Sequence, residues 1–236
     1  MKLKGIVPRT WRLIKKIFIF LFFFQLFYIL LLRWVDPPFT ITQMGSMVHG
    51  WFNGYGFKRD YVDMEAISFH ARLAVIASED QLFVDHGGFD WKSIEKAMEY
   101  NKKKPNRTRG ASTISQQVAK NVFLWQGRSW LRKGLEVYFT KMIEWIWGKR
   151  RILEVYLNVI EMGKGVYGIE AAAQAYFSKP ASALTAREAA MIAACLPNPV
   201  KFTVKPASAR VKSRTPFILR QMNNLKNDTD ILKVIQ

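Results

Sequence analysis

The hydrophobic positions of the chain form one long run near the N-terminus and short periodic stretches after it. The run covers residues 17–32, and Leu13, Ile14, Trp34 and Val35 can extend it to the ~20 residues that a bilayer requires. We therefore predict a transmembrane anchor at 17–35. All charged residues before it are basic, so the positive-inside rule predicts a cytoplasmic tail at 1–16 and export of the rest. The run lacks the small residues of a signal-peptide cleavage site, which favours an uncleaved anchor.

Residues 36–60 are rich in proline and glycine and lack sustained periodicity, so we expect a stalk that lifts the next domain off the membrane. The remaining residues, 61–236, suffice for one domain with a full hydrophobic core. Helical spacing dominates in this domain, and Asp90 stands where a helix N-cap belongs. Two pairs have capping-box spacing, Thr113 with Gln116 and Thr185 with Glu188.

The segment 149–163 shows the clearest division into faces. Its apolar stripe consists of Ile152, Leu153, Tyr156, Leu157 and Ile160. Glu154, Asn158 and Glu161 share the opposite face, which we expect to be polar. No alternating stretch indicates a large sheet, and no internal repeat is present. The predicted fold class is therefore mainly α.

Charge and cysteine content narrow the function classes. The formal net charge is +18, and without the seven basic residues up to Arg33 the remainder still has 29 basic against 18 acidic residues, or +11. Such a surface suits nucleic acid, anionic lipid or a phosphorylated substrate, and export past a membrane argues against nucleic acid. The single cysteine, Cys195, excludes an internal disulfide framework.

Three clusters of polar residues are candidates for chemistry. In 78–90, acidic side chains crowd around an aromatic residue and two glycines, so a desolvated Glu79 could serve as a general base. Composition alone favours the alternative, a solvated acidic loop, because such loops are common. In 107–121, a glycine and basic residues precede a polar helix start, which suits either an anion site or an ordinary capped helix. In 130–151, basic and aromatic residues alternate, as in a membrane-lying helix or in a core stripe with snorkelling cations.

The order of these motifs resembles the peptidoglycan glycosyltransferases, glycosyltransferase family 51. The family pattern EDxxFxxHxGxD corresponds to Glu79–Asp90, and GxSTISQQ corresponds to Gly110–Gln117. The later motifs RKxxE, KxxILExYLN, YGIxAAAxxYF and EAAxLAAxLPNP correspond to 132–136, 149–158, 167–177 and 188–199. The resemblance covers the chain from about Glu65 to Pro199.

The resemblance implies a lysozyme-like glycosyltransferase domain with a small membrane-associated subdomain at about 122–147, preceded by a single transmembrane helix. It implies that the enzyme transfers a glycan chain from undecaprenyl pyrophosphate to the 4-hydroxyl of the N-acetylglucosamine of lipid II, with inversion to a β-1,4 linkage. Glu79 would be the catalytic base, and Glu136 the second essential acid. Lys120 and Arg128 match positions that contact the pyrophosphate. Further substrate-binding candidates are Arg109, Ser112, Gln116, Gln117, Arg132 and Lys133, and Asp80, Phe83 and His86 would support the site.

The resemblance further implies a divalent cation, Mg²⁺ by preference, that bridges the substrate phosphates. We expect no residue of the protein to be a metal ligand. The expected partners are lipid II, the growing glycan and membrane lipids, together with cell-wall synthesis or division proteins and without nucleic acid. The expected location is the bacterial inner membrane, with the catalytic domain on its outer face and a role in cell-wall biogenesis and cell shape.

Two other functions remain open from the residues alone. A lytic transglycosylase or lysozyme-like enzyme would share the helical fold and the catalytic glutamate, but it would not need a basic groove for pyrophosphate. A non-catalytic cell-wall scaffold would need neither the catalytic glutamate nor the basic groove. Ser93 and Lys96 match the Ser-x-x-Lys pattern of transpeptidase domains. The partner motifs that such a domain requires do not follow, so we expect no transpeptidase activity.

Overall fold

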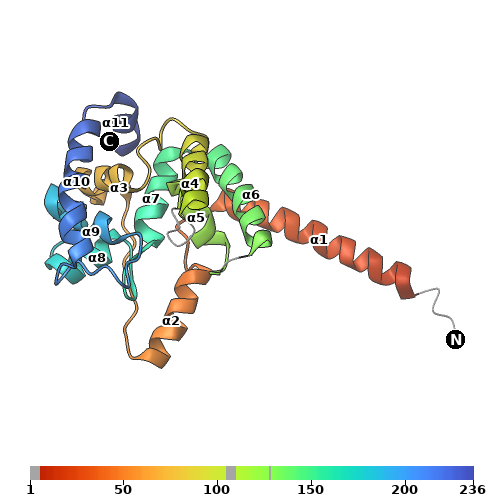
Figure 1. Cartoon of the computed structure of the whole chain (residues 1–236). Coiled ribbons are helices and arrows are strands. Elements are labelled where there is room, and N and C mark those ends of the chain that lie inside the picture. The colour runs from red at the N-terminus through yellow and green to blue at the C-terminus, as the bar shows by residue number, and fades with distance from the viewer. Residues whose placement is uncertain (1–5, 105–109, 128) are drawn as a thin grey trace. The chain divides into compact units, whose positions relative to one another are not determined.

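The chain folds into helices with very little sheet. The computed structural model describes residues 6–104, 110–127 and 129–236, with only the backbone for 6–9. Within these ranges it has eleven α-helices, two short 3-10 helices and one small sheet, which confirms the mainly α class (Figure 1). The chain divides into two compact units, Met1–Asp36 and Pro37–Gln236.

The first unit is the helix α1 (Ile6–Leu31). Its stretch Thr10–Leu31 is long and apolar enough to cross a membrane, and it is the one such helix among the described residues. The predicted membrane span 17–35 overlaps this stretch and extends four residues beyond the helix. Arg33 and Trp34 donate to carbonyls three residues back, which tightens the last turn, so the helix ends before Trp34 and Val35.

The second unit contains the remaining elements. Its α-helices are α2 (Ile41–Asn53), α3 (Phe69–Glu79), α4 (Trp91–Lys103), α5 (Ile114–Phe123), α6 (Trp130–Ile146), α7 (Lys149–Val159), α8 (Ile169–Phe177), α9 (Ala186–Cys195), α10 (Ala209–Leu225) and α11 (Thr229–Ile235). The 3-10 helices are η2 (Met64–Ala66) and η3 (Ala181–Ala183), and the strands are β1 (Lys58–Arg59), β2 (Glu161–Gly163) and β3 (Val166–Tyr167). In the sheet, β3 lies between β1, with which it is parallel, and β2, with which it is antiparallel.

Two groups of helices form the core. In the first, α3, α9 and α10 pack against one another, and the fully buried alanines Ala74, Ala77, Ala190 and Ala193 let α3 and α9 approach closely. In the second, α5 packs against α6 and α7. The site described below lies where α5 meets the C-terminal end of α3, so both groups position it.

The helix starts follow the local sequence signals. Asp90 accepts a hydrogen bond from the Ser93 amide and caps α4, as predicted. Both predicted capping boxes form, at the starts of α5 and α9. On the polar face of α7, Asn158 is fully buried, and its amide is satisfied because it accepts from and donates to the backbone of Val62 (3.0 and 2.9 Å).

Residues 36–60 contain a regular helix, contrary to the expected lack of periodicity. Thr40 and Gln43 form a capping box at the start of α2, and Gly54 ends it in the left-handed conformation. After the helix, Arg59 in β1 donates to the carbonyls of Pro37 and Pro38. These hydrogen bonds tie the start of the segment to β1, so it is part of the second unit and not an extended stalk.

Candidate active site

Glu79 is the last residue of α3 and lies at the centre of the site. The buried side of α3 holds the helix in the core, and the chain leaves the helical conformation at Asp80. The Glu79 carboxylate accepts hydrogen bonds from Gln117 Nε2 (3.1 Å) and Ser78 Oγ (3.3 Å). Burial raises the pKa of Glu79, while the two hydrogen bonds and the charge of Arg214 oppose the rise. A carboxyl group with a raised pKa and neutral hydrogen-bond partners suits a general base.

Gln117 is itself oriented by a buried tyrosine. The hydroxyl of Tyr156, on α7, donates to Gln117 Oε1 (3.2 Å), so the Nε2 of the same amide points to Glu79. On α5, Asn121 Nδ2 donates to the Gln117 carbonyl (2.8 Å). Because Tyr156 is fully buried and sits in the core, α7 fixes the donor that faces the Glu79 carboxylate.

Asp80 ties the loop after α3 to the start of α5. It accepts from the backbone amide of Ile114 (3.0 Å) and pairs with His86 Nε2 (3.0 Å). The amide of Gly88 donates to His86 Nδ1 (3.1 Å), so Nδ1 is unprotonated and Nε2 carries the hydrogen that Asp80 accepts. Because Asp80 directly follows Glu79, these contacts also hold Glu79 against the start of α5.

Two further features hold this loop in place. Phe83 is fully buried, and Lys149 Nζ lies over its ring at 4.6 Å from the centroid. Gly88 has φ +95°, and a Cβ there would lie 2.7 Å from Thr140 Cγ2 on α6. Only glycine fits that backbone conformation and that contact.

Glu136 has the opposite environment to Glu79. It is 3% exposed on α6, and it pairs with Arg132 Nη1 (2.7 Å) and Lys133 Nζ (2.5 Å). Lys120 of α5 belongs to the same charge cluster, because Glu136 raises the pKa of Lys120 while burial, Arg132 and Lys133 lower it, and the net shift is downward. Three cations thus surround one carboxylate, which leaves a net positive charge suited to a phosphate group.

Helix α5 connects the two environments. Gln117 and Lys120 are one turn apart on it, and both line a cavity of about 700 Å³. Its other walls come from α2, from residues 160–167 and from residues 196–200. Lys164 adds a second cation to the lining, and Glu161 has a raised pKa because of burial. The cavity thus touches the hydrogen-bond partner of Glu79 and one cation of the Glu136 cluster, and it is large enough for sugar rings.

The structure brings some of the predicted residues together and separates others. Glu79 and Gln117 are in contact, as are Glu136, Arg132 and Lys133. Arg109 and Arg128 lie outside the described residues.

Of the described substrate candidates, Gln117 and Lys120 line the cavity, whereas Ser112, Gln116, Arg132 and Lys133 do not. Ser112 is exposed, and Gln116 is buried because its side chain turns back to accept from the Thr113 amide (3.1 Å) in the capping box. The structure thus assigns Gln116 a capping role, and its contact with substrate stays a prediction. Its spacing from Thr113 was the signal that pointed to the cap.

The sequence reasoning missed Tyr156 and Arg214 as residues of the site. Tyr156 was assigned to an apolar stripe, and nothing local distinguishes a core tyrosine from one whose hydroxyl reaches a polar neighbour. Arg214 lies on α10, 135 positions after Glu79, in a tail to which no role was assigned. Its charge lowers the pKa of Glu79 because α10 packs against α3.

The described residues include no group of three or more His, Cys, Asp or Glu side chains that could hold a metal ion. Asp80 is engaged by His86 and the Ile114 amide, and Glu136 is engaged by its two cations. Because no three such groups converge among the described residues, their side chains do not fit a resident divalent cation.

The fold and the site define a helical domain in which a half-buried carboxyl group with a raised pKa and a cation cluster lie beside a sugar-sized cavity. The model of the family described as Transglycosylase matches residues 45–223. The chain therefore belongs to the transglycosylase family, which confirms the resemblance and the lysozyme-like fold and makes the chain a glycosyltransferase. Proteins of several Escherichia coli strains and of Shigella boydii serotype 4, each named biosynthetic peptidoglycan transglycosylase, are 56% identical to it over 191 residues, or 80% of this chain and 79% of theirs.

Proposed function

We propose that the protein polymerises peptidoglycan by transferring a lipid-linked glycan chain to the 4-hydroxyl of the N-acetylglucosamine of lipid II. The observation that carries this proposal is the contrast between the two glutamates. Glu79 has neutral donors and a raised pKa, whereas Glu136 is neutralised by two cations. One carboxylate can accept a proton, and the other holds cations in place for a departing phosphate.

In the proposed reaction Glu79 removes the proton of the acceptor hydroxyl. The hydroxyl oxygen forms a bond to the anomeric carbon of the donor, and the bond between that carbon and the pyrophosphate oxygen breaks. The pyrophosphate leaves with the electron pair, and attack from the opposite face inverts an α-linked donor to a β-1,4 bond. Lys120, Arg132 and Lys133 stabilise the negative charge that develops on the leaving group. A divalent cation, if the reaction uses one, would be held by the phosphates of the substrate.

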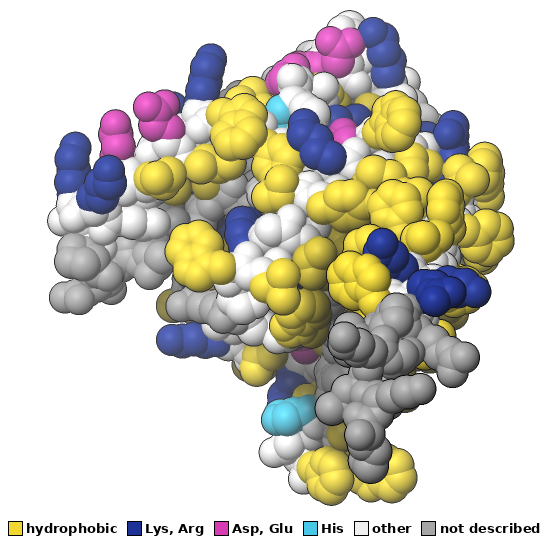
Figure 2. Space-filling view, turned by 90° about the vertical axis from the view of Figure 1, so that its right-hand side faces the viewer, with side chains coloured by type: hydrophobic (Ala, Val, Ile, Leu, Met, Phe, Trp, Pro, Cys, Tyr) yellow, Lys and Arg dark blue, Asp and Glu magenta, His cyan; other side chains and the backbone are white. Residues whose placement is uncertain are grey.

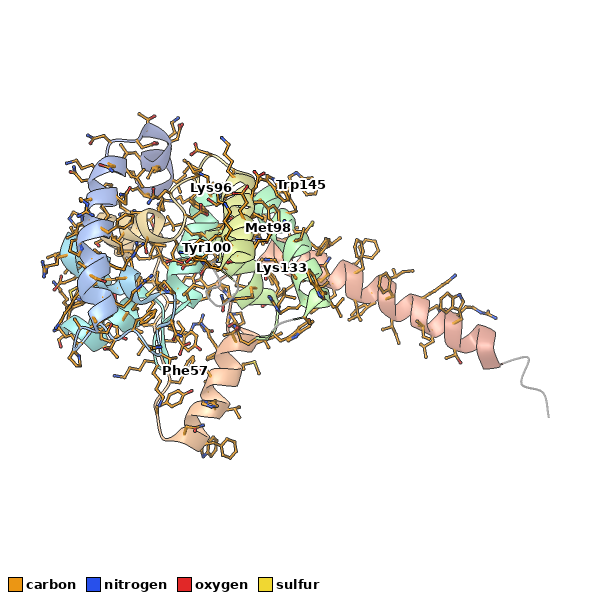
Figure 3. The ribbon with its side chains drawn as sticks, viewed as in Figure 1. Phe57, Lys96, Met98, Tyr100, Lys133 and Trp145 are labelled. Atoms are coloured by element: carbon orange, nitrogen blue, oxygen red, sulfur yellow. The ribbon has the colours of Figure 1, made fainter. Side chains whose placement is uncertain are left out.

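The enzyme works at the membrane, in this proposal. The span Thr10–Leu31 would anchor it with the N-terminus inside and the catalytic domain outside. The segment 122–147 would form the membrane-associated part, because Trp130 is 93% and Trp145 83% exposed. Figure 3 shows Trp145 and Lys133 on α6 and Met98 on α4, and hydrophobic side chains lie among Lys and Arg on the face drawn in Figure 2. Exposed tryptophans mixed with cations are typical of a membrane interface.

The test is chain growth from fluorescent lipid II in detergent, followed on a gel for the wild type, Glu79→Gln and Lys120→Ala. We expect the wild type to form polymer that lysozyme digests. Glu79→Gln should abolish this polymer, and Lys120→Ala should strongly reduce it. If the folded wild type shortens preformed strands and makes no polymer, the protein is a cleaving enzyme. If neither activity appears and the variants behave as the wild type, it is a scaffold.

A further inference from the structure

Helix α2 has three distinct faces. One face packs on the domain, where Gln43 is buried and donates to the Val159 carbonyl (3.4 Å) and Gly50 is buried beside Tyr55. A second face, with Thr42, Gly45, Ser46 and His49, lines the cavity. Figure 1 shows that the helix projects from the body of the second unit.

The third face is apolar and exposed. It consists of Ile41, Met44, Val48, Trp51 and Phe52, and the last two are 88% and 83% exposed. Successive residues of a helix are 100° apart, so these five share a single stripe on the side away from Gln43 and Gly50. The helix contains no acidic, Lys or Arg residue that would oppose burial of this stripe in lipid. A soluble surface rarely exposes two such aromatic residues next to each other.

The covalent chain limits how far this helix can be from the membrane-crossing segment. α1 ends at Leu31, and from Pro37 on the chain is fixed to β1 by Arg59. Only residues 32–36 lie between these points, and five residues span at most ~18 Å. α2 begins four residues after Pro37, so its apolar stripe is tethered close to a membrane surface.

We propose that α2 lies at the outer surface of the membrane that α1 crosses, with its apolar stripe in lipid. In this position the helix forms the wall between the lipid and the cavity. An α-helix with its side chains is ~10 Å across. A lipid-linked head group that passes this wall reaches Lys120 and Gln117 while its chain remains in the bilayer. The role of α2 as a wall rests on the proposed polymerase reaction, whereas its membrane contact rests only on α1 as the membrane anchor.

The contact is tested with an environment-sensitive fluorophore on Val48→Cys in the full chain, reconstituted into phosphatidylethanolamine and phosphatidylglycerol vesicles with doxyl-labelled lipid. The matched control is Asn223→Cys, on the exposed side of α10, and the wild type controls for labelling because Cys195 is buried. We expect strong quenching at Val48 and little at Asn223. Absence of quenching at Val48 overturns the proposal, whether the probe stays in water or a second copy of the chain covers it. This readout does not depend on polymerase activity, so it separates the membrane contact from the proposed function.

The role as a wall is tested with the double variant Val48→Glu and Trp51→Glu, neither of which lines the cavity. Charges at an interface weaken lipid contact modestly, so we expect about tenfold lower kcat/KM on lipid II in vesicles. On a short-chain soluble analogue in detergent, the rate should match the wild type. An equal loss in both assays would overturn the wall, because it would indicate damage to the cavity and not to membrane contact.

Discussion

The hydrogen bonds from Tyr156 to Gln117 and from Gln117 to Glu79 predict a one-way dependence between three residues. Tyr156 orients the amide of Gln117, and of these two residues Gln117 is the one that donates to the Glu79 carboxylate. We consider Gln117→Leu, which keeps the volume and removes the donor, and Tyr156→Phe, which removes only the hydroxyl. Both substitutions should reduce the polymerisation rate through the same carboxylate.

The magnitudes follow from the kind of hydrogen bond that each substitution removes. A hydrogen bond to a charged group contributes about 1.5–3 kcal/mol, so Gln117→Leu should lower kcat by roughly 10- to 150-fold. A hydrogen bond between neutral groups contributes about 0.5–1.5 kcal/mol, so Tyr156→Phe should lower kcat by roughly 2- to 10-fold. Because Tyr156 acts through Gln117, the double variant should be no slower than Gln117→Leu alone.

The pH profile gives a second readout. The base works when ionised, so the rate rises as the pH passes the pKa of Glu79, which burial has raised. The Gln117 bond lowers that pKa, and its loss moves the acid limb of the profile to higher pH, with the largest rate loss at low pH. The neighbouring groups that also act on Glu79 are Ser78, Asp80 and Arg214, and they are unchanged in these variants.

The assay is initial-rate polymerisation of lipid II across pH for the wild type, both single variants and the double variant. Thermal unfolding confirms that each variant is folded. Additive losses in the double variant would refute the relay, because Tyr156 would then act on the reaction independently of Gln117. An unchanged acid limb in Gln117→Leu would refute Glu79 as the group that this limb reports.

Three other substitutions have definite expected signs. Arg214→Gln removes a charge that lowers the pKa of Glu79, so the acid limb of the polymerisation profile should move to higher pH; a limb that stays in place would exclude any effect of α10 on the base. Glu136→Gln removes the charge that raises the pKa of Lys120, so the alkaline limb should move to lower pH, and a shift to higher pH would contradict the cation cluster. Gly88→Ala places a methyl group in a left-handed conformation against α6, and it should cost about 2–5 kcal/mol of unfolding free energy in urea titrations; a cost below about 1 kcal/mol would contradict the close contact.

The sequence predicted best what depends on neighbouring residues. The capping pairs of α5 and α9 and the Asp90 cap formed because a side chain three residues from its backbone partner needs no tertiary information. The apolar run gave α1, since length and composition decide whether a helix can cross a bilayer.

The parts that the sequence did not predict depend on contacts between distant segments. Asn158 has helical spacing on a polar face, but its amide pairs with the backbone of Val62, which lies 96 positions earlier. Residues 36–60 read as irregular because one face of α2 is polar toward the cavity and another is apolar toward the outside, so no two-sided pattern appears. A helix that borders both a polar cavity and lipid has no core-facing stripe for a periodicity rule to detect. The proposed membrane contact of α2 thus also explains why the sequence concealed the helix, and the fluorophore on Val48 tests both statements.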